Sequence, residues 1–198
     1  MQTDNAKNPE PISMLEKMLL HHCTPALFGL KQANLFSCPK NGALIAEIRD
    51  YNRLLNKTGV YIRVLYQCRN RLSILVYREK TLREYLGQKA VSEYLLENGY
   101  PEDCGQADYI PRAFCRLRKR MAECAFPHEI GFFLGYPVED VFGFMTQNGR
   151  NFKCCGYWKV YGDEEEAMKI FSRYDKCREI ISKKVVTGTP ILKLLGIA

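Results

Sequence analysis

Two apolar segments separated by a two-residue connection constrain the fold of this chain more than any other feature. Residues 59–68 read GVYIRVLYQC and residues 71–78 read RLSILVYR, and both are rich in β-branched and aromatic side chains. With only Arg69 and Asn70 between them, the segments predict an antiparallel β-hairpin over residues 60–78. Apolar residues occupy both parities of the second segment: Leu72, Ile74 and Val76 on one, and Leu75 and Tyr77 on the other. Both faces of the hairpin are therefore expected to be covered by other elements.

Helical patterns fill most of the remaining chain. They predict helices over residues 12–20 and 42–55 and from Pro111 to Phe126. A further helical region is predicted to begin at a capping-box pattern at 81–84 and to end at Gly99. Pro127 and Pro137 are expected at the first positions of two short helices, with Gly135 as a stop between them.

The C-terminal part of the chain adds one strand and one long helix. Residues 154–161, CCGYWKVY, predict a further strand. Asp163 and Glu166 form a cap-like pair that opens the helix. Its inward face is expected to carry Met168, Phe171, Tyr174 and Ile181. The chain is therefore predicted to be α+β, a mostly helical single domain at residues 11–198 around a small sheet, behind a flexible N-terminal arm at residues 1–10.

The composition bears on location and on the kinds of site to expect. The chain has nine cysteines, and its N-terminal stretch has no uninterrupted apolar segment of the kind that a signal peptide requires. No apolar run is long enough to span a bilayer, so a cytoplasmic protein with reduced thiols and no membrane partner is expected. No C-x-x-C pair occurs, which disfavours a zinc ribbon or a ferredoxin-type cluster.

Cys23 lies in the segment HHCTP, where Pro25 is expected to begin a helix and Thr24 to cap it. A helix N-terminus stabilises a nearby negative charge by only about 0.3–1 kcal/mol, which is less than one pKa unit. A reactive thiolate would therefore also need a protonated His21 or His22, or a metal ion. Equally, Cys23 and one histidine can fill a corner between two helices without any chemical role.

His128 and the predicted strand at 154–161 are the other places where chemistry is expected. A histidine at a helix start favours the neutral imidazole, which suits a metal ligand or a general base but also a bond to a neighbouring loop. Along a strand, alternate residues share a face, so the side opposite Cys154 is predicted to carry Cys155, Tyr157, Lys159 and Tyr161. This amphipathic face is expected either to form the floor of a pocket or to lie half-exposed.

A basic stripe is predicted on the helix that begins at Pro111. Arg112, Arg116, Lys119 and Arg120 fall on one face, and the formal net charge of the chain is +7. Such a stripe can meet phosphate groups, but solvated basic faces are more common, and no nucleic-acid motif accompanies this one. The chain also contains no dinucleotide-binding glycine motif, P-loop, serine-hydrolase elbow or zinc-protease signature.

Three segments together resemble a known family. They are HCTPALFGLKQANLF at 22–36, FPHEIGFFLGYPVEDVFGFM at 126–145 and KCCGYWKVYGDEEEAMKIF at 153–171. The family consists of small uncharacterised cytosolic proteins found mainly in anaerobic Firmicutes such as clostridia, and the resemblance covers nearly the whole chain after the N-terminal arm. It implies no particular activity, but it does imply a flavodoxin-like or iron-linked redox partner.

The resemblance also selects positions, because a site of the family is expected to lie inside its motifs. The motif positions of interest are His22, Cys23, Lys31, Asn34, His128, Glu129, Tyr136, Asp140, Cys154, Gly156, Tyr157, Trp158 and Lys159, and Cys155 also lies inside a motif. Four cysteines lie outside the motifs and are expected to be packing residues: Cys68, Cys104, Cys115 and Cys124.

Two hypotheses with chemistry follow, in order of preference. The first is a metal- or redox-responsive protein that binds zinc or iron, since imidazole and thiolate ligands suit both metals. Its ligands would be His22, Cys23, His128, Cys154 and Cys155. The second is a thiol enzyme with Cys23 as nucleophile and His128 as base, in which Lys31 or Asn34 holds a substrate anion.

The third hypothesis is a binding module without chemistry. Its ligand would be an anionic molecule or, less favoured, a nucleic acid, held by the basic stripe or by the face that carries Tyr157. Tyr136 and Lys159 complete the set of predicted ligand-binding residues.

Overall fold

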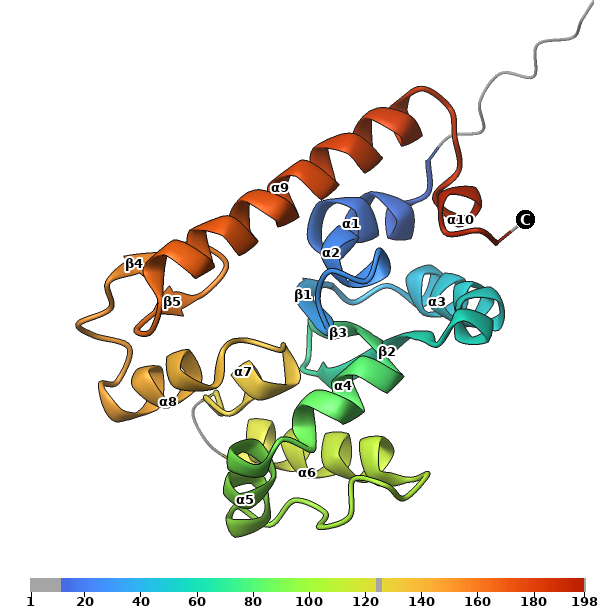
Figure 1. The fold of residues 1–198 in the computed structure, drawn as a ribbon. Helices are drawn as coiled ribbons and strands as arrows, with labels where there is room; N and C mark the ends of the chain where they lie inside the picture. Colours follow the sequence, from blue (N-terminus) through green and yellow to red (C-terminus); the bar gives the residue numbers. More distant parts are fainter. Residues whose placement is uncertain (1–11, 124–125, 198) are drawn as a thin grey trace, which may run out of the picture.

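The computed structural model describes residues 12–123 and 126–197, so the predicted arm at residues 1–10 lies outside the described residues. A three-stranded antiparallel sheet with the order β1-β3-β2 occupies the centre of the molecule (Figure 1). Its strands are β1 (Ala33–Pro39), β2 (Val60–Gln67) and β3 (Arg71–Arg78). The β2–β3 pair confirms the hairpin predicted from the sequence. Strand β1 was not predicted, because its apolar residues are interrupted by Asn34 and Ser37.

Each face of the sheet is covered, as the two parities of β3 predict. Leu72, Ile74 and Val76 of β3 belong to one apolar cluster, and Leu75 and Tyr77 belong to another. The first cluster is completed by helices from the two ends of the chain, and the second by helices from its middle. The predicted α+β class, mostly helical around a small sheet, is confirmed.

Helices from both ends of the chain cover the first face. They are α1 (Met14–His22), α2 (Thr24–Leu27), α3 (Gly42–Leu55), α9 (Glu164–Val186) and α10 (Ile191–Leu194), with a 3-10 turn η1 (Asn56–Thr58) after α3. Ser13 and Glu16 form a capping box on α1, and Asp163 Oδ1 accepts from Glu166 N at 2.9 Å to start α9, as predicted. Figure 1 shows α9 running along the molecule from strands β4 and β5 at one end to α10 at the other.

Helices from the middle of the chain cover the second face. They are α4 (Glu79–Leu86), α5 (Lys89–Glu97), α6 (Tyr109–Glu123), α7 (Ile130–Phe133) and α8 (Val138–Thr146). Gly99 and Gly135 follow α5 and α7 in the left-handed region, with φ of +76° and +66°, which confirms both predicted stops.

Several predicted helix details were wrong, and in each case packing overrode a local signal. Strand β3 continues directly into α4 at Glu79, so residues 81–84 lie inside the helix instead of opening it. Helix α6 begins at Tyr109, before Pro111, and α7 begins at Ile130, after Pro127. Met168 is 53% exposed, because Ala167 and Phe171 are the residues of that turn that face the core.

The predicted strand at 154–161 was also wrong, since the chain reverses within it. Two short strands, β4 (Cys154–Cys155) and β5 (Lys159–Val160), pair antiparallel and leave Gly156, Tyr157 and Trp158 in the turn. A Cβ at Gly156 would lie 2.4 Å from Phe171 of α9, so this turn can approach the helix only with glycine there. The predicted alternation of faces therefore does not apply to these residues.

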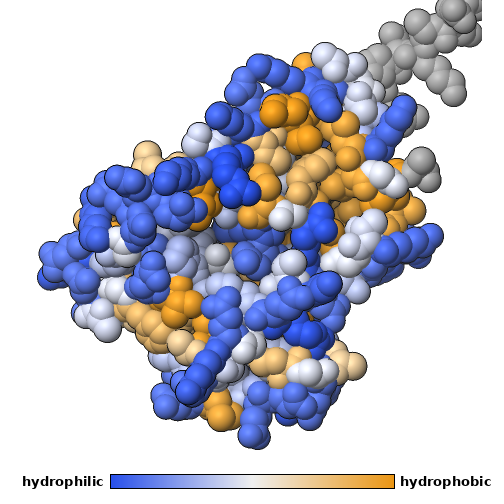
Figure 2. Space-filling model, viewed as in Figure 1, coloured by the Kyte–Doolittle hydropathy of each residue, from blue (hydrophilic) through white to orange (hydrophobic). Residues whose placement is uncertain are grey.

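Hydrophilic and apolar side chains are unevenly distributed over the surface (Figure 2). Figure 2 shows a mainly hydrophilic face with an apolar patch where α1, α10 and the C-terminal part of α9 meet. None of the helices in the described part of the chain is both long enough and apolar enough to cross a membrane.

Candidate functional site

A polar pocket of about 250 Å³ lies where α1, β1, α9 and the β4–β5 turn come together. Its polar lining consists of His21, His22, Lys31, Asn34, Tyr136, Tyr157 and Arg178. Leu35 and Leu134 complete the lining, and no aspartate or glutamate belongs to it. A pocket lined by cations and neutral donors, with no acidic group, has the electrostatics of an anion site.

The turn between α2 and β1 places Lys31 inside the molecule. The backbone N–H groups of Leu30 and Lys31 both donate to Pro25 O, at 2.8 and 3.2 Å, which folds the segment back over α2. Gly29, at φ +80°, allows this reversal. Arg78 fixes the other side of the turn, because its guanidinium donates to the carbonyls of Ala26 and Leu27.

Lys31 is the most unusual group of the polar pocket. Its exposed fraction is 4%, and its Nζ lies 4.6 Å from the centroid of the Tyr136 ring. Among the described residues, no carboxylate pairs with it, and the one charge-bearing neighbour that affects it is the Cys23 thiol. Burial lowers the pKa of Lys31 to about 7, because the ammonium form loses its hydration without gaining a counter-charge.

Arg178 of α9 supplies the second cation of the polar pocket. Its Nη2 donates to Tyr157 Oη, and Tyr157 Oη donates to Asp175 Oδ1 at 2.8 Å. Its Nη1 lies 3.6 Å from the same aspartate oxygen. Its Nε is buried and has no hydrogen-bond partner among the described residues. Buried donors are nearly always satisfied, so this N–H is an unusual feature of the pocket.

The remaining polar groups of the pocket are arranged around these two cations. Burial, together with the neighbouring His21 and Arg178, lowers the pKa of His22, whose ring stacks on Phe36 at 5.3 Å. Burial raises the pKa of Tyr136 to about 12, so its hydroxyl stays protonated at neutral pH. Asn34 Oδ1 accepts from Ala26 N at 3.1 Å, which fixes this side chain between β1 and α2.

Cys23 belongs to the core behind the polar pocket. It is the C-cap residue of α1 and also the N-cap residue of α2, and its exposed fraction is 0%. Burial raises the pKa of its thiol far above the usual range, despite the opposing effect of Lys31. A fully buried neutral thiol is a poor nucleophile, so the geometry does not support Cys23 in the catalytic role predicted for it.

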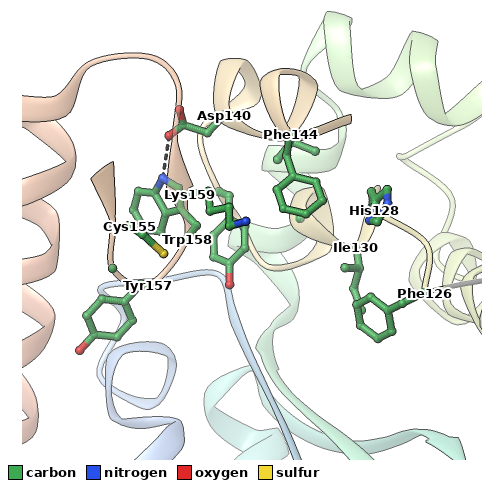
Figure 3. A pocket seen from close by; sticks show the side chains of 13 residues that line it. Phe126, His128, Ile130, Asp140, Phe144, Cys155, Tyr157, Trp158 and Lys159 are labelled. Atoms are coloured by element: carbon green, nitrogen blue, oxygen red, sulfur yellow. Dashed lines mark hydrogen bonds between the residues drawn. The ribbon is translucent and has the colours of Figure 1, made fainter. Parts of the chain in front are cut away.

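A second pocket, of about 310 Å³, lies beside the first and is mainly apolar. Figure 3 shows Cys155 and Tyr157 on one side of it and His128, Ile130 and Phe126 on the other. Of the predicted site residues, His128, Cys155 and Lys159 therefore share this apolar pocket. Cys155 is exposed, and His128 packs edge-on against Phe144 with ring centroids 4.9 Å apart.

Asp140 holds together the wall between the two pockets. It is buried, and it accepts hydrogen bonds from Trp158 Nε1 at 2.6 Å, from Tyr161 N at 2.6 Å and from Gly162 N at 2.8 Å. These bonds fasten the β4–β5 hairpin to α8. Tyr136 and Tyr157 line both pockets, so the two cavities are neighbours across these rings.

The predicted metal ligands do not assemble. Within residues 12–123 and 126–197, no three side chains of histidine, cysteine, aspartate or glutamate come together as a metal site would require. His22 lines the polar pocket, and His128 and Cys155 line the apolar one. Two of the cysteines predicted to be packing residues, Cys68 and Cys115, are instead exposed. Cys104 is partly buried, and Cys124 lies outside the described residues.

Two residues of the basic stripe on α6, Arg116 and Arg120, make structural contacts within the protein. Arg120 pairs with the buried Glu129, which also accepts from Tyr100 Oη at 3.0 Å, and Arg116 Nε donates to Asn98 O at 3.0 Å. Arg112 and Lys119, with Arg116, line a separate open pocket of about 410 Å³. The buried pair and the backbone contact explain part of the stripe without a ligand.

Sequence reasoning missed Arg178 and His21 as pocket residues. A signal for Arg178 was present, because it occupies the apolar stripe of α9. The buried residues of that stripe are Ala167, Phe171, Tyr174, Ile181 and Val185, and position 178 continues their spacing. A charged residue on such a stripe needs a partner, and here it lines a pocket.

Comparison with known proteins identifies the family but adds no activity. A search of curated proteins found no match, and a search of solved structures found none either. A family model described as "Protein of unknown function (DUF3793)" matches residues 19–195, which confirms the predicted membership of an uncharacterised family. The clostridial origin and the flavodoxin-like or iron-linked partner stay predictions. Because the match spans nearly the whole chain, this protein belongs to the DUF3793 family.

Proposed function

We propose that this protein is a cytoplasmic binding protein for a small organic anion, which it holds in the polar pocket. The observation that carries this proposal is the pair of unpartnered donors in one cavity. Within the described residues, Lys31 Nζ has no counter-charge, and Arg178 Nε has no hydrogen-bond partner. An anion bound in the pocket would supply the counter-charge that Lys31 lacks.

The size and enclosure of the cavity limit the ligand. A volume of about 250 Å³ lies just below the usual range for ligand pockets, which favours a molecule of a few heavy atoms. Carboxylate and phosphate groups both match an arginine and a lysine. The ligand is therefore expected to be a small carboxylate or a small phosphate compound.

The thiols support the location in the cytoplasm. All eight cysteines in the described part of the chain are free, although several are exposed. Free exposed thiols are typical of reducing compartments. The metal-responsive and thiol-enzyme hypotheses have less support, since the first lacks a gathered ligand set among the described residues and the second requires a buried neutral thiol to react.

Binding can be measured through the single tryptophan. Trp158 stacks on Tyr136 with ring centroids 5.2 Å apart, so its fluorescence reports on the wall of the polar pocket. We expect saturable binding of acetate or of inorganic phosphate, checked by calorimetry. Lys31→Met and Arg178→Met should each weaken it at least about tenfold, because each removes a charge-assisted hydrogen bond.

Lys159→Met is the matched control. Lys159 lines the apolar pocket, and its Nζ donates to Gly149 O at 2.7 Å. Its replacement should leave anion binding unchanged. The proposal is overturned if neither anion binds saturably, or if the Lys31 and Arg178 variants bind as tightly as the Lys159 variant.

A further inference from the structure

Lys31 differs from an ordinary anion-binding lysine in the depth of its burial. Lysines that only neutralise a ligand charge keep the ammonium hydrated, whereas Lys31 is 4% exposed and rests on an aromatic ring. The neighbouring Cys23 is a neutral thiol at neutral pH, so it supplies no counter-charge. With a pKa of about 7, a large fraction of Lys31 is therefore the free amine at neutral pH.

A free amine that lines a pocket is a nucleophile, and the other groups of the polar pocket indicate which molecule it would react with. We propose that Lys31 forms a Schiff base with the carbonyl group of a small 2-oxo acid whose carboxylate is held by Arg178. This proposal rests on the anion site proposed above and adds a covalent step to it. A 2-oxo acid carries its carbonyl on the carbon next to the carboxylate, and Lys31 and Arg178 both line the one cavity of about 250 Å³ in which such a molecule would bind.

The step balances without any further reactant. The lone pair of Lys31 Nζ attacks the carbonyl carbon and forms a C–N bond, while the carbonyl oxygen takes up a proton. The resulting carbinolamine loses water and leaves a protonated C=N bond. Overall, amine, oxo acid and one proton give the iminium ion and one water molecule, and nothing is oxidised or reduced.

The polar pocket also holds a group that can supply the proton. His22 lines the same cavity, and its pKa lies below the usual histidine value because of burial and of His21 and Arg178. An imidazole with a lowered pKa is mainly neutral at neutral pH, so His22 can take up a proton from solvent and pass it to the carbonyl oxygen. Burial raises the pKa of Tyr136, which lines the same pocket, to about 12, so its hydroxyl remains a neutral hydrogen-bond donor.

Reductive trapping tests the proposal. The full chain is incubated near neutral pH with pyruvate and cyanoborohydride, which reduces an iminium ion to a stable secondary amine, and is then mapped by peptide mass spectrometry. We expect the adduct at Lys31 at least about tenfold faster than at an exposed lysine such as Lys169, since an ordinary lysine with a pKa of about 10.4 is almost fully protonated there.

Three controls separate the covalent step from binding. Acetone has the carbonyl group without the carboxylate and should label Lys31 at least about tenfold more slowly, because it gains nothing from the Arg178 site. Lys31→Arg retains a cation that cannot condense, and it should bind acetate but give no adduct. Lys159→Met should be trapped like the unaltered protein.

The outcomes distinguish the two proposals. If acetate or phosphate binds but pyruvate leaves no adduct on Lys31, the Schiff base is overturned and the anion site stands. If pyruvate and acetone label Lys31 equally, the paired recognition of carboxylate and carbonyl is overturned. If neither binding nor trapping occurs, both proposals fall.

Discussion

The two pockets of this protein share Tyr136 and Tyr157, yet each contains a lysine in a different state. Lys159 lies over Phe152 at 4.7 Å and donates to Gly149 O, so its charge is satisfied at the surface. Lys31 also lies over an aromatic ring but has no such acceptor among the described residues. A lysine over an aromatic ring therefore makes a structural contact in one pocket, at Lys159. In the other pocket, Lys31 has the same kind of neighbour but remains free to bind a ligand.

The cysteines of the two regions show the reverse contrast. Cys155 is exposed at the rim of the apolar pocket, whereas Cys23 is wholly buried behind the polar one. The polar pocket therefore contains the amine of Lys31 but no accessible thiol. The apolar pocket contains the exposed thiol of Cys155, and the amine of its Lys159 is already hydrogen-bonded. Reactivity cannot be assigned from residue type, because burial and hydrogen bonding decide it.

Alkylation gives the largest expected difference between the two regions. With iodoacetamide on the folded protein, Cys155 should react at least about 10³ times faster than Cys23, because Cys23 becomes accessible only when the core opens. Mass spectrometry of the labelled peptides measures the ratio. In denaturant the two rates should become similar, and rapid labelling of Cys23 in the folded protein would contradict its assigned burial.

The next largest expected effect is on the stability of the protein, when Asp140 beside the two pockets is replaced. Asp140→Asn should lower the free energy of unfolding by about 2–3 kcal/mol, because an amide cannot accept from Trp158 and from both backbone N–H groups as the carboxylate does. Urea denaturation followed by tryptophan fluorescence measures it. Glu139→Gln, an exposed neighbour on the same helical turn, should change the stability by no more than about 0.5 kcal/mol.

Lys31 should couple stability to pH, and Lys159 serves as its control. The pKa of Lys31 is about 7 in the folded protein and near 10.5 in the unfolded chain, so the unfolded chain binds more protons between these values and stability rises with pH there. Between about pH 6 and about pH 8.5, this contribution amounts to roughly 2 kcal/mol. Lys31→Met should remove it, which makes the variant gain most over the unaltered protein at the lower pH.

The comparison between variants isolates Lys31 from the other titrating groups around it. Those groups are Cys23, His21, His22, Tyr136, Tyr157, Asp175 and Arg178. They are present in both proteins, so the difference in unfolding free energy between the unaltered protein and Lys31→Met is the quantity to follow. A difference that does not vary with pH would contradict the buried amine, and Lys159→Met should show no such variation.

The smallest expected effect comes from a single hydroxyl group. Tyr157→Phe removes the hydroxyl that bridges Arg178 and Asp175, although the direct ion pair between them remains, and should weaken acetate binding about two- to fivefold through loss of orientation. Tyr161→Phe is the matched control, since the Tyr161 hydroxyl is buried without a hydrogen-bond partner among the described residues. Equal binding by the two variants would show that the Tyr157 hydroxyl does not position Arg178.

Much of the fold followed from short-range patterns. The period of two in residues 71–78 predicted both the hairpin and its cover on two faces, and Asp163 predicted the start of α9. The strand at 154–161 was wrong for a long-range reason, since the turn at Gly156 packs on Phe171. Strand β1 was missed because it is recognisable mainly by its pairing with β3.

The sequence by itself determined the β2–β3 hairpin, most of the helices and two of their stops, because caps, stops and alternation act between residues that are close along the chain. It also narrowed the candidate residues, since Lys31, Asn34, Tyr136 and Tyr157 all line the polar pocket. Only the tertiary structure decided their chemistry. Lys31 and Arg178 line the same pocket although they lie far apart along the chain. The protonation state of a charged group depends on which residues exclude water from it and which residues pair with it, and no local pattern specifies these.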